Sequence, residues 1–357
     1  MNQKALGTTA AAKRHTSIFQ HTEFTLGVII IAIFIAASVG TDHFFSQYNL
    51  ENLAKQCAII GVLAIAQTMI ITTGGIDISG GAITGLSCMV LALLQRDTQI
   101  NFYLTVLIAL AIGMAAGFIN GFIIYNFKVP PMIATLGTST IISGVALLIS
   151  KALTVSGLDS RILSLGSGKL FGFLPTLAIF WLVVAGIIYL VLKYTIFGRN
   201  LYVIGSGVEV ARLCGVKVRK MYYSVYALAG LLYGVAGIML AARVQSALPN
   251  GGAGYDMNAI AAAVIGGASL TGGRGTIGGT LLGTLLMNLI NSAGTQFKWN
   301  THVLDIVSGA LLIFAVTMDM LRNGQNSFSL RLFSKRRGRA LPTTAQGPDA
   351  DGTQQLK

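Results

Sequence analysis

Residues 74–85 read GGIDISGGAITG and residues 272–283 read GGRGTIGGTLLG, each inside strongly apolar sequence. At a constant offset of 198 positions, five glycines of the first stretch recur in the second, and threonine precedes both stretches. The recurring pairs are Gly74 and Gly272, Gly75 and Gly273, Gly80 and Gly278, Gly81 and Gly279, and Gly85 and Gly283. Matching glycine-interrupted apolar segments in two halves of a chain are typical of a transport pathway through a membrane.

The composition indicates an integral membrane protein. Of the 357 residues, 54% are hydrophobic and 10% are charged, whereas a soluble domain carries roughly 25% charged residues. The net charge of +13 does not indicate nucleic-acid binding, because the basic residues gather between the apolar runs, as membrane orientation requires. The three cysteines and four histidines are dispersed, and their spacing indicates neither disulfides nor a metal site.

The apolar runs predict an all-α fold of about ten transmembrane helices, because lipid offers no partners for unpaired backbone groups. The first run is interpreted as an uncleaved helix and not as a signal peptide. The eighth is short and rich in Gly and Ala, so it is either a full span or a broken or re-entrant one. The ten ranges are 24–40, 54–73, 79–95, 103–126, 131–150, 173–194, 221–244, 257–270, 276–297 and 302–321.

The distribution of Lys and Arg predicts that both termini are cytoplasmic, because most basic residues then fall on the inner side. The chain divides into a cytoplasmic N-terminal tail (1–23), a transmembrane domain (24–321) and a basic, disordered C-terminal tail (322–357). The offset of 198 maps helices 1–4 onto helices 7–10 in the same orientation. This predicts a parallel internal repeat with both glycine segments at cytoplasmic turns.

The sequence contains no motif typical of an enzyme: neither G-x-x-x-x-G-K-[ST], G-x-S-x-G nor H-E-x-x-H occurs. The acidic residues near the predicted spans, Asp77, Asp256, Asp305 and Asp319, all lie at or near helix ends. A carboxylate near the bilayer centre costs ~2.5–3.5 kcal/mol on insertion scales, which carriers driven by protons or sodium often accept to build an ion site. A cation-coupled secondary transporter of a small polar solute therefore stays an alternative, although the sequence shows no carboxylate in the middle of a predicted span.

The longest predicted inner loop, residues 195–220, reads TIFGRNLYVIGSGVEVARLCGVKVRK. Ser206 and Glu209 fit a capping box, in which each side chain bonds the other's backbone N–H. A short helix is expected to follow, with Arg212 in its last turns and Gly215 just past its end. This helix is either a tight connector or a docking element for a cytoplasmic partner.

Four stretches resemble the permease subunit of ATP-binding-cassette importers for monosaccharides, the ribose, arabinose, xylose and galactoside group. They are TTGGIDISGGAITG at 72–85, KVPPMIATLGT at 128–138, FGRNLYVIGSGVEVARLCGVKV at 197–218 and AIAAAVIGGASLTGGRGTIGGTLLG at 259–283. The resemblance spans nearly everything between helices 1 and 10. The chain departs from the family at Gly80, where a larger apolar residue is usual, and at Gly207, where asparagine is common.

The resemblance implies a permease domain in the bacterial inner (plasma) membrane that imports a monosaccharide or related small polyol. The chain itself would be no enzyme and hold no cofactor, because ATP and Mg would be bound by a separate cytoplasmic ATPase. Further partners would be a second permease chain, identical or homologous, a periplasmic sugar-binding protein and membrane lipid. The residues implied to couple the ATPase through the 195–220 loop are Ser206, Glu209, Ala211, Arg212 and Gly215.

Under this interpretation the glycine segments form hinges or an inner gate, and polar residues in the spans form the substrate pathway. We expect Asp77 and Arg274 to face each other at the gate; two unrelated interfacial charges are the alternative. The pathway side chains could equally bind neighbouring helices. The gate candidates are Gly74, Gly75, Asp77, Gly80, Gly81, Gly272, Gly273, Arg274, Gly278 and Gly279. The pathway candidates are Gln67, Asn120, Thr135, Asn258, Asn288 and Asn291.

Overall fold

The computed structural model describes residues 22–41 and 43–337. Most of the predicted N-terminal tail and residues 338–357 lie outside the described residues. The chain falls into two units that divide between Asp319 and Met320, and the description below concerns the first. The elements are α1 (Thr22–Gly40), α2 (Gln47–Thr72), α3 (Gly80–Asp97), α4 (Phe102–Phe127), α5 (Pro131–Ser150), α6 (Ser160–Ser167), β1 (Lys169–Leu170), β2 (Leu174–Pro175), α7 (Thr176–Tyr194), α8 (Ile196–Ser206), α9 (Val208–Leu213), α10 (Val218–Val244), α11 (Tyr255–Ile265), α12 (Ile277–Gln296) and α13 (Thr301–Arg337).

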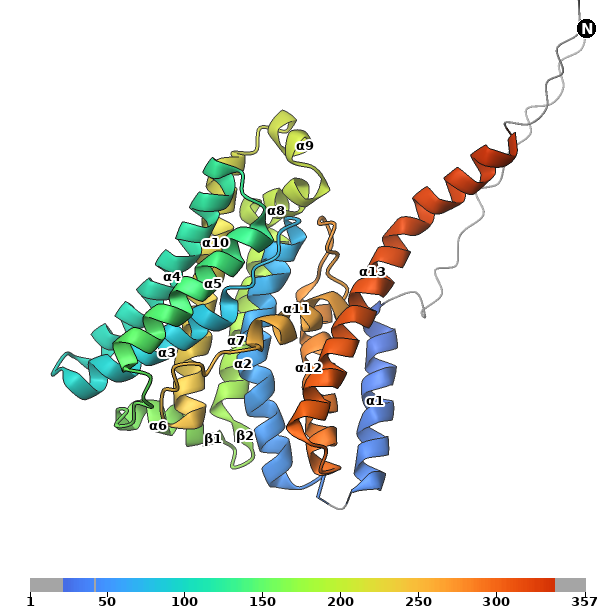
Figure 1. Cartoon of the computed structure of the whole chain (residues 1–357). Coiled ribbons are helices and arrows are strands. Elements are labelled where there is room, and N and C mark those ends of the chain that lie inside the picture. The colour runs from blue at the N-terminus through green and yellow to red at the C-terminus, as the bar shows by residue number, and fades with distance from the viewer. Residues whose placement is uncertain (1–21, 42, 338–357) are drawn as a thin grey trace, which may run out of the picture. The chain divides into compact units, whose positions relative to one another are not determined.

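The all-helical prediction is confirmed, and each of the ten predicted ranges contains a helix (Figure 1). Seven helices in the described chain are long and apolar enough to cross a membrane: α1, α2, α4, α5, α7, α10 and α13. The helix in the eighth range, α11, has 11 residues. At 1.5 Å per residue it is about 16 Å long, roughly half of a hydrocarbon layer. Ten full spans therefore stay a prediction.

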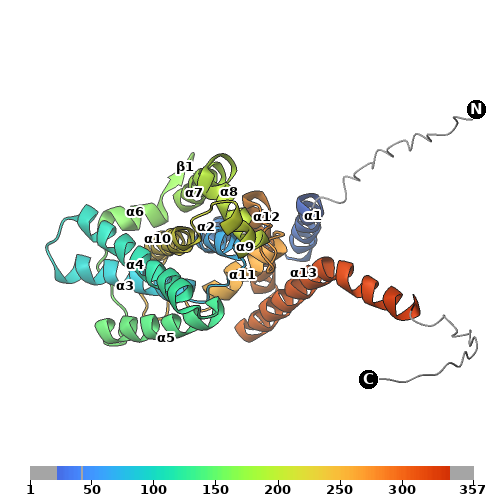
Figure 2. The same cartoon turned by 90° about the horizontal axis from the view of Figure 1, so that it is seen from above.

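Helices α2 and α10 form the interior of the bundle. In their most apolar windows, 83% of α2 and 78% of α10 is buried, against 17% for α1. Seen from above, α2 lies between α10 and α12 (Figure 2). The outer helices expose apolar faces, which suit lipid contact.

Glycines let α4 and α10 pack backbone against backbone. A Cβ on Gly117 of α4 would lie 2.1 Å from the carbonyl oxygen of Tyr226, and one on Gly230 of α10 would lie 2.2 Å from that of Gly113. Because Gly113 and Gly117 are four residues apart, they lie on one helix face. This is the small-xxx-small packing that membrane helices use in place of a hydrophobic driving force.

The bounds of several helices agree with the 198-residue offset. Shifted by 198 positions, α3 covers 278–295, which α12 contains, and α1 covers 220–238, which α10 contains. In addition, α1 packs against α12 as α10 packs against α3. The match is incomplete, because α2 has 26 residues and α11 has 11. The parallel orientation of the repeat stays a prediction.

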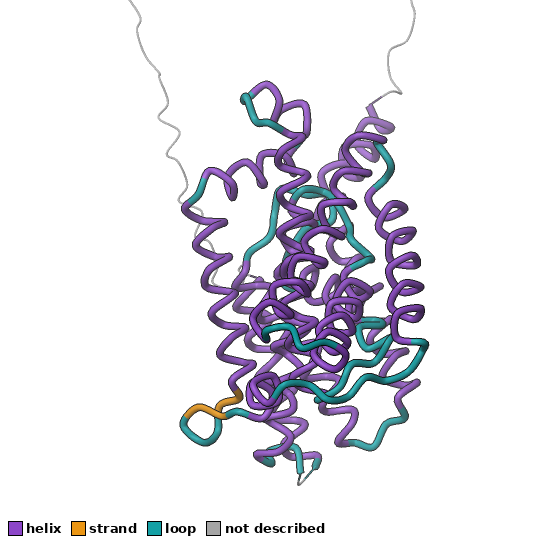
Figure 3. The backbone as a smooth tube through the Cα atoms, turned by 90° about the vertical axis from the view of Figure 1, so that its left-hand side faces the viewer, coloured by secondary structure: helices purple, strands orange, loops and turns teal. Residues whose placement is uncertain are grey.

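Several short elements did not follow from hydropathy. Helix α6 begins after Asp159, whose carboxylate accepts the backbone N–H of Arg161 at 2.8 Å. Strands β1 and β2 form a small antiparallel hairpin, orange in Figure 3. Lys169 in this hairpin pairs with Glu51 of α2 at 2.6 Å. Helix α13 extends through Arg337, past the expected boundary at 321.

Candidate functional site

The two glycine turns meet at a partly exposed junction, where Gly74 is exposed and Gly272 and Gly273 are half-buried. Gly74 (φ 83°), Gly272 (φ 86°) and Gly273 (φ 74°) have left-handed backbone, which glycine adopts without steric penalty. The backbone N–H of Gly273 donates to the carbonyl oxygen of Thr72 at 2.9 Å. Gly75 has ordinary φ but lies so close to α10 that a Cβ would be 2.7 Å from the Tyr226 hydroxyl. Turn geometry and close approach therefore both require glycine here.

Helix α8 packs directly onto this junction. A Cβ on Gly205 would lie 1.9 Å from the carbonyl oxygen of Thr72 and 2.3 Å from the backbone nitrogen of Gly273. The Tyr202 hydroxyl donates to the carbonyl oxygen of Gly275 at 2.8 Å. The loop predicted at 195–220 is thus joined to both glycine turns, through the main chain of Gly205 and the hydroxyl of Tyr202.

The predicted capping box is wrong. Ser206 is the last residue of α8, and its hydroxyl donates to the carbonyl oxygen of Val203 at 2.8 Å. The physical reason is that Thr195 already begins a helix, accepting the N–H of Gly198 at 3.3 Å, so Ser206 belongs to that helix. Gly207, with φ 156° and ψ 126°, separates α8 from α9.

The end of the short helix α9 lies where the sequence predicts it. Gly215 has φ 76°, and its N–H donates to the carbonyl oxygen of Arg212 at 2.9 Å. The N–H of Val216 donates to the carbonyl oxygen of Ala211 at 2.9 Å. These two bonds form a Schellman motif, which satisfies carbonyls left over at a helix end.

The side chains of α9 divide into an anchored face and a free face. Ala211 is fully buried, whereas Val210 is 50% and Leu213 89% exposed. Glu209 and Arg212 form an ion pair at 2.7 Å on the exposed side, and such pairs stabilise a fold by less than about 1 kcal/mol. Helix α9 therefore presents apolar side chains outward that the fold itself does not use.

Asp77 and Arg274 do not pair. Asp77 is fully buried, and its Oδ1 accepts from the backbone N–H of Ser79 at 2.8 Å and from the Ser79 hydroxyl at 2.6 Å. Its Oδ2 has no hydrogen-bond partner in the described chain. The carboxylate folds back on its own loop because the N–H and hydroxyl of Ser79 are near donors, a side-chain direction that sequence spacing does not reveal.

Three of the predicted pathway residues hold this same loop. Gln67 donates its side-chain amide to the carbonyl oxygen of Asp77, and Asn120 donates to the Ser79 hydroxyl at 2.8 Å. The Thr135 hydroxyl accepts a backbone N–H of the loop at 3.0 Å. Gln67, Asn120 and Thr135 are fully buried, so their interactions position the α2–α3 loop. This is the neighbouring-helix alternative that the sequence left open.

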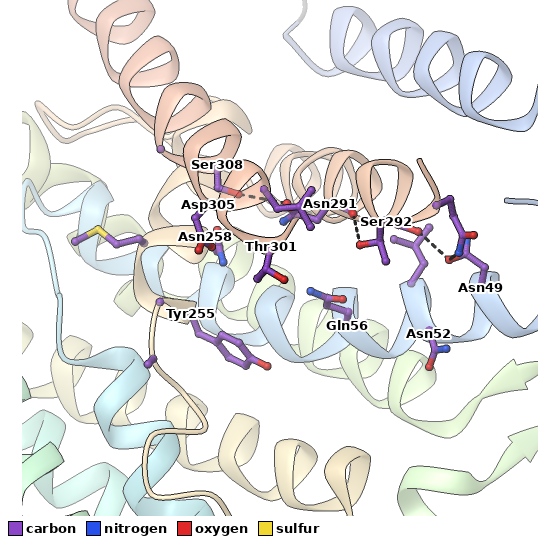
Figure 4. Close-up of a pocket in the computed structure, with 18 of the residues that line it drawn as sticks. Asn49, Asn52, Gln56, Tyr255, Asn258, Asn291, Ser292, Thr301, Asp305 and Ser308 are labelled. Atoms are coloured by element: carbon purple, nitrogen blue, oxygen red, sulfur yellow. Dashed lines mark hydrogen bonds between the residues drawn. The ribbon is translucent and has the colours of Figure 1, made fainter. Parts of the chain in front are cut away.

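Asn258 and Asn291 instead lie on a large cavity of mixed polar and apolar lining, whereas Asn288 is buried and donates to the carbonyl oxygen of Thr284 in its own helix. The cavity, of about 790 Å³, lies between α2, α11, α12 and the start of α13 (Figure 4). This volume falls in the range of roughly 300–1,000 Å³ typical of ligand pockets. Its other polar lining includes Asn52, Gln56, Tyr255, Ser292 and Asp305.

The cavity's α2 side was missed because α2 starts earlier than its apolar run. Ser46 caps the helix by accepting the N–H of Asn49, so about two extra turns carry polar residues into the protein. Asn49 Oδ1 accepts from Ser292 at 3.0 Å and from Gln296 at 2.9 Å. The Ser-x-x-Asn start at residue 46 was the available signal. Side-chain amides offer both donors and acceptors, which suits a neutral solute rich in hydroxyl groups.

Comparison with known proteins places the fold in a family. Residues 49–316 match the family described as branched-chain amino acid transport system / permease component. The chain belongs to this permease family. It is 36% identical over 296 residues to the ribose import permease protein of Bacillus subtilis (strain 168), covering 82% of this chain and 91% of the relative.

Two Escherichia coli (strain K12) proteins give similar values. The galactose/methyl galactoside import permease protein is 34% identical over 312 residues, 82% of this chain and 93% of its own length. A probable ABC transporter permease protein is 32% identical over 309 residues, 87% and 92% of the two lengths. Family membership and the seven candidate spans identify the chain as a multi-pass permease of the bacterial inner membrane, as the sequence predicts.

Proposed function

We propose that the chain is the transmembrane subunit of an ATP-binding-cassette importer for a monosaccharide or related small polyol. The observation that carries this proposal is an amide-lined cavity of about 790 Å³ in a chain 36% identical to a ribose import permease. Sugars expose many hydroxyl groups, which amides can bond as donors and as acceptors. Arg243 and Asp305 also line the cavity, and a guanidinium donates to hydroxyl groups as a carboxylate accepts from them.

The cavity and α9 belong to opposite ends of the permease. The cavity is lined by the first turns of α2, and the Thr72 end of α2 carries the glycine junction. With 26 residues, α2 separates these ends by about 39 Å. The distribution of Lys and Arg assigns the cavity end to the periplasm, where a binding protein would deliver the sugar. The α9 end would then face the cytoplasm.

Helix α9 is proposed as the docking element for the ATPase, with Val210 and Leu213 entering the partner. Displacement of α9 would move α8, and Gly205 would transmit that movement to both glycine turns. ATP and Mg would be held by the partner, as would hydrolysis. Nucleotide binding would then shift the population between inward-open and outward-open arrangements, through different contacts with α9 in each. A second permease chain, identical or homologous, would complete the pore.

Reconstitution of the purified chain with candidate ATPase and binding-protein subunits tests this function. We expect uptake of D-ribose or D-galactose into vesicles only when ATP and both partners are present. Uptake driven by an imposed proton or sodium gradient, without ATP, would overturn the proposal in favour of a cation-coupled carrier.

A further inference from the structure

A second, smaller polar cavity lies beside the first turn of α11. We call it the Asp256 niche; its volume is about 190 Å³. It is separated from the large cavity by a thin partition, because Ala253 and Gly254 line both cavities. Its walls come from α3, α5, the segment before α11 and the first turn of α11, through Gly81, Gly85, Ser139, Ser143, Asn250 and Asp256.

Two glycines of the repeated motif line the niche: Gly81 packs closely, since a Cβ on it would lie 2.3 Å from the carbonyl oxygen of Gly252, whereas Gly85 borders open space that its equivalent in the second copy lacks. In the second copy, a Cβ on Gly283 would lie 2.0 Å from the carbonyl oxygen of Ala262, so the space is filled by the backbone of α11. In the first copy, a Cβ on the equivalent Gly85 would meet nothing closer than 3.6 Å. The space beside Gly85 is therefore not required for helix packing.

The side chains around this space suit hydroxyl groups. Asp256 is partly buried, and its Oδ1 lies 3.2 Å from the position of a Cβ on Gly81, at the niche wall. It forms no salt bridge among the described residues, whose ion pairs all lie elsewhere. Ser139 and Ser143 are four residues apart on α5 and share one face. A carboxylate accepts two hydroxyl protons side by side, and serine hydroxyls donate or accept.

We propose that the Asp256 niche binds adjacent hydroxyl groups of a neutral polyhydroxylated solute, at a second position beyond the large cavity. The proposal rests on the proposed function for its class of solute. The partition between the two positions is the glycine-rich start of α11, in which Gly254 has φ 78°. Rotation at this segment would join the two cavities without moving a long helix.

Protection of an introduced cysteine from a thiol reagent tests the niche directly. Ser143→Cys is placed in the full chain, in membranes with its partner subunits, and treated with a polar methanethiosulfonate. We expect D-ribose or D-galactose to slow modification of Cys at 143 several-fold, and 2-deoxy-D-ribose to protect less well than D-ribose. The exposed native Cys214, which adjoins the proposed docking helix α9, is replaced by Ser, and the other two native cysteines, Cys57 and Cys88, are buried, so the reagent reports on position 143.

The carboxylate is tested on the same background. Asp256→Asn should raise the sugar concentration for half-protection roughly ten-fold or more, since hydrogen bonds to charged groups are among the stronger ones. Asp97→Asn is the matched control, because Asp97 lies in an exposed ion pair with Arg96. Equal protection with and without the Asp256 carboxylate would overturn the assignment.

A substitution that adds a methyl group to the niche provides a second test if Ser143→Cys fails to reach the membrane. Gly85→Ala, whose methyl group has room, should raise the KM for uptake, whereas Gly137→Ala on α5, with nothing within 4 Å, should not. If uptake is driven by ATP but sugar does not protect Cys at 143 and the KM of Gly85→Ala is unchanged, the niche proposal is wrong and the importer function stands. If sugar protects Cys at 143 but uptake is not driven by ATP, the importer function is wrong and the sugar site in the niche is retained.

Discussion

The backbone N–H of Gly273 donates a hydrogen bond to the carbonyl oxygen of Thr72 at 2.9 Å, which ties the second glycine turn to the first. Gly205 of α8 lies against both of these groups, so three segments that are distant in the sequence share one junction. Every contact in it is made by main-chain atoms. Movement of α8 would therefore displace the C-terminal end of α2 and the α11–α12 connection together.

Gly205→Ala should reduce transport strongly while the permease still reaches the membrane. The methyl group would lie 1.9 Å from a backbone oxygen, so α8 must move away from both turns. We expect sugar uptake to fall at least ten-fold at equal membrane expression, with ATP hydrolysis no longer stimulated by the loaded binding protein. Gly186→Ala on α7, where nothing lies within 4 Å, is the control. Normal uptake by the Gly205 variant would contradict a role of the junction in coupling.

Leu213→Asp should weaken ATPase binding while leaving the fold intact. Leu213 is 89% exposed, so its replacement removes no packing within the chain, but a carboxylate would be desolvated in an apolar interface. Co-purification of the ATPase with the permease measures the effect, and thermal unfolding checks the fold. Glu209→Gln is the comparison, expected to change stability by less than about 1 kcal/mol because its ion pair is exposed. Undiminished co-purification of the Leu213 variant would place the docking surface elsewhere.

Asp77→Ala should destabilise the protein more than Asp77→Asn. Alanine removes the acceptor for two donors of the buried Ser79, and an orphaned buried donor costs about 1–3 kcal/mol. Asparagine retains an oxygen at that position. Thermal unfolding in detergent compares the two. Exchanging Asp77 and Arg274 should not restore function relative to the single variants; rescue by the exchange would show that the two charges meet during transport.

Asn291→Ala and Gln56→Ala should each raise the KM for sugar several-fold with little change in maximal rate. Both amides line the large cavity and would lose a hydrogen bond worth about 0.5–1.5 kcal/mol. Asn126→Ala is the matched control. Asn126 does not line the large cavity, and its side-chain amide donates to the Tyr223 hydroxyl at 2.6 Å. Uptake measured across sugar concentrations decides, and an unchanged KM in both cavity variants would remove the cavity from the pathway.

Hydropathy and length sufficed to locate ten helices, because lipid forces each apolar run to satisfy its own backbone. They could not show that Asp77 turns toward Ser79, because side-chain direction depends on which donors the fold brings near. The break between α8 and α9 was likewise missed. The Ser206–Glu209 spacing fits a capping pattern, but Ser206 is the last residue of α8 and Gly207 separates the two helices. The cavity required the polar first turns of α2, which lie outside any apolar window.

The division between backbone and side chains has a consequence for how such permeases change substrate. The junction of Thr72, Gly205 and Gly273 is built from main chain, whereas the cavity is lined by replaceable amides and hydroxyls. Under the proposed function, substitutions in the cavity would therefore alter which solute is accepted without disturbing the glycine junction. One unchanged arrangement of main chain would then serve different solutes, and directed evolution of specificity should begin with Asn52, Gln56 and Asn291 and leave the glycine turns untouched.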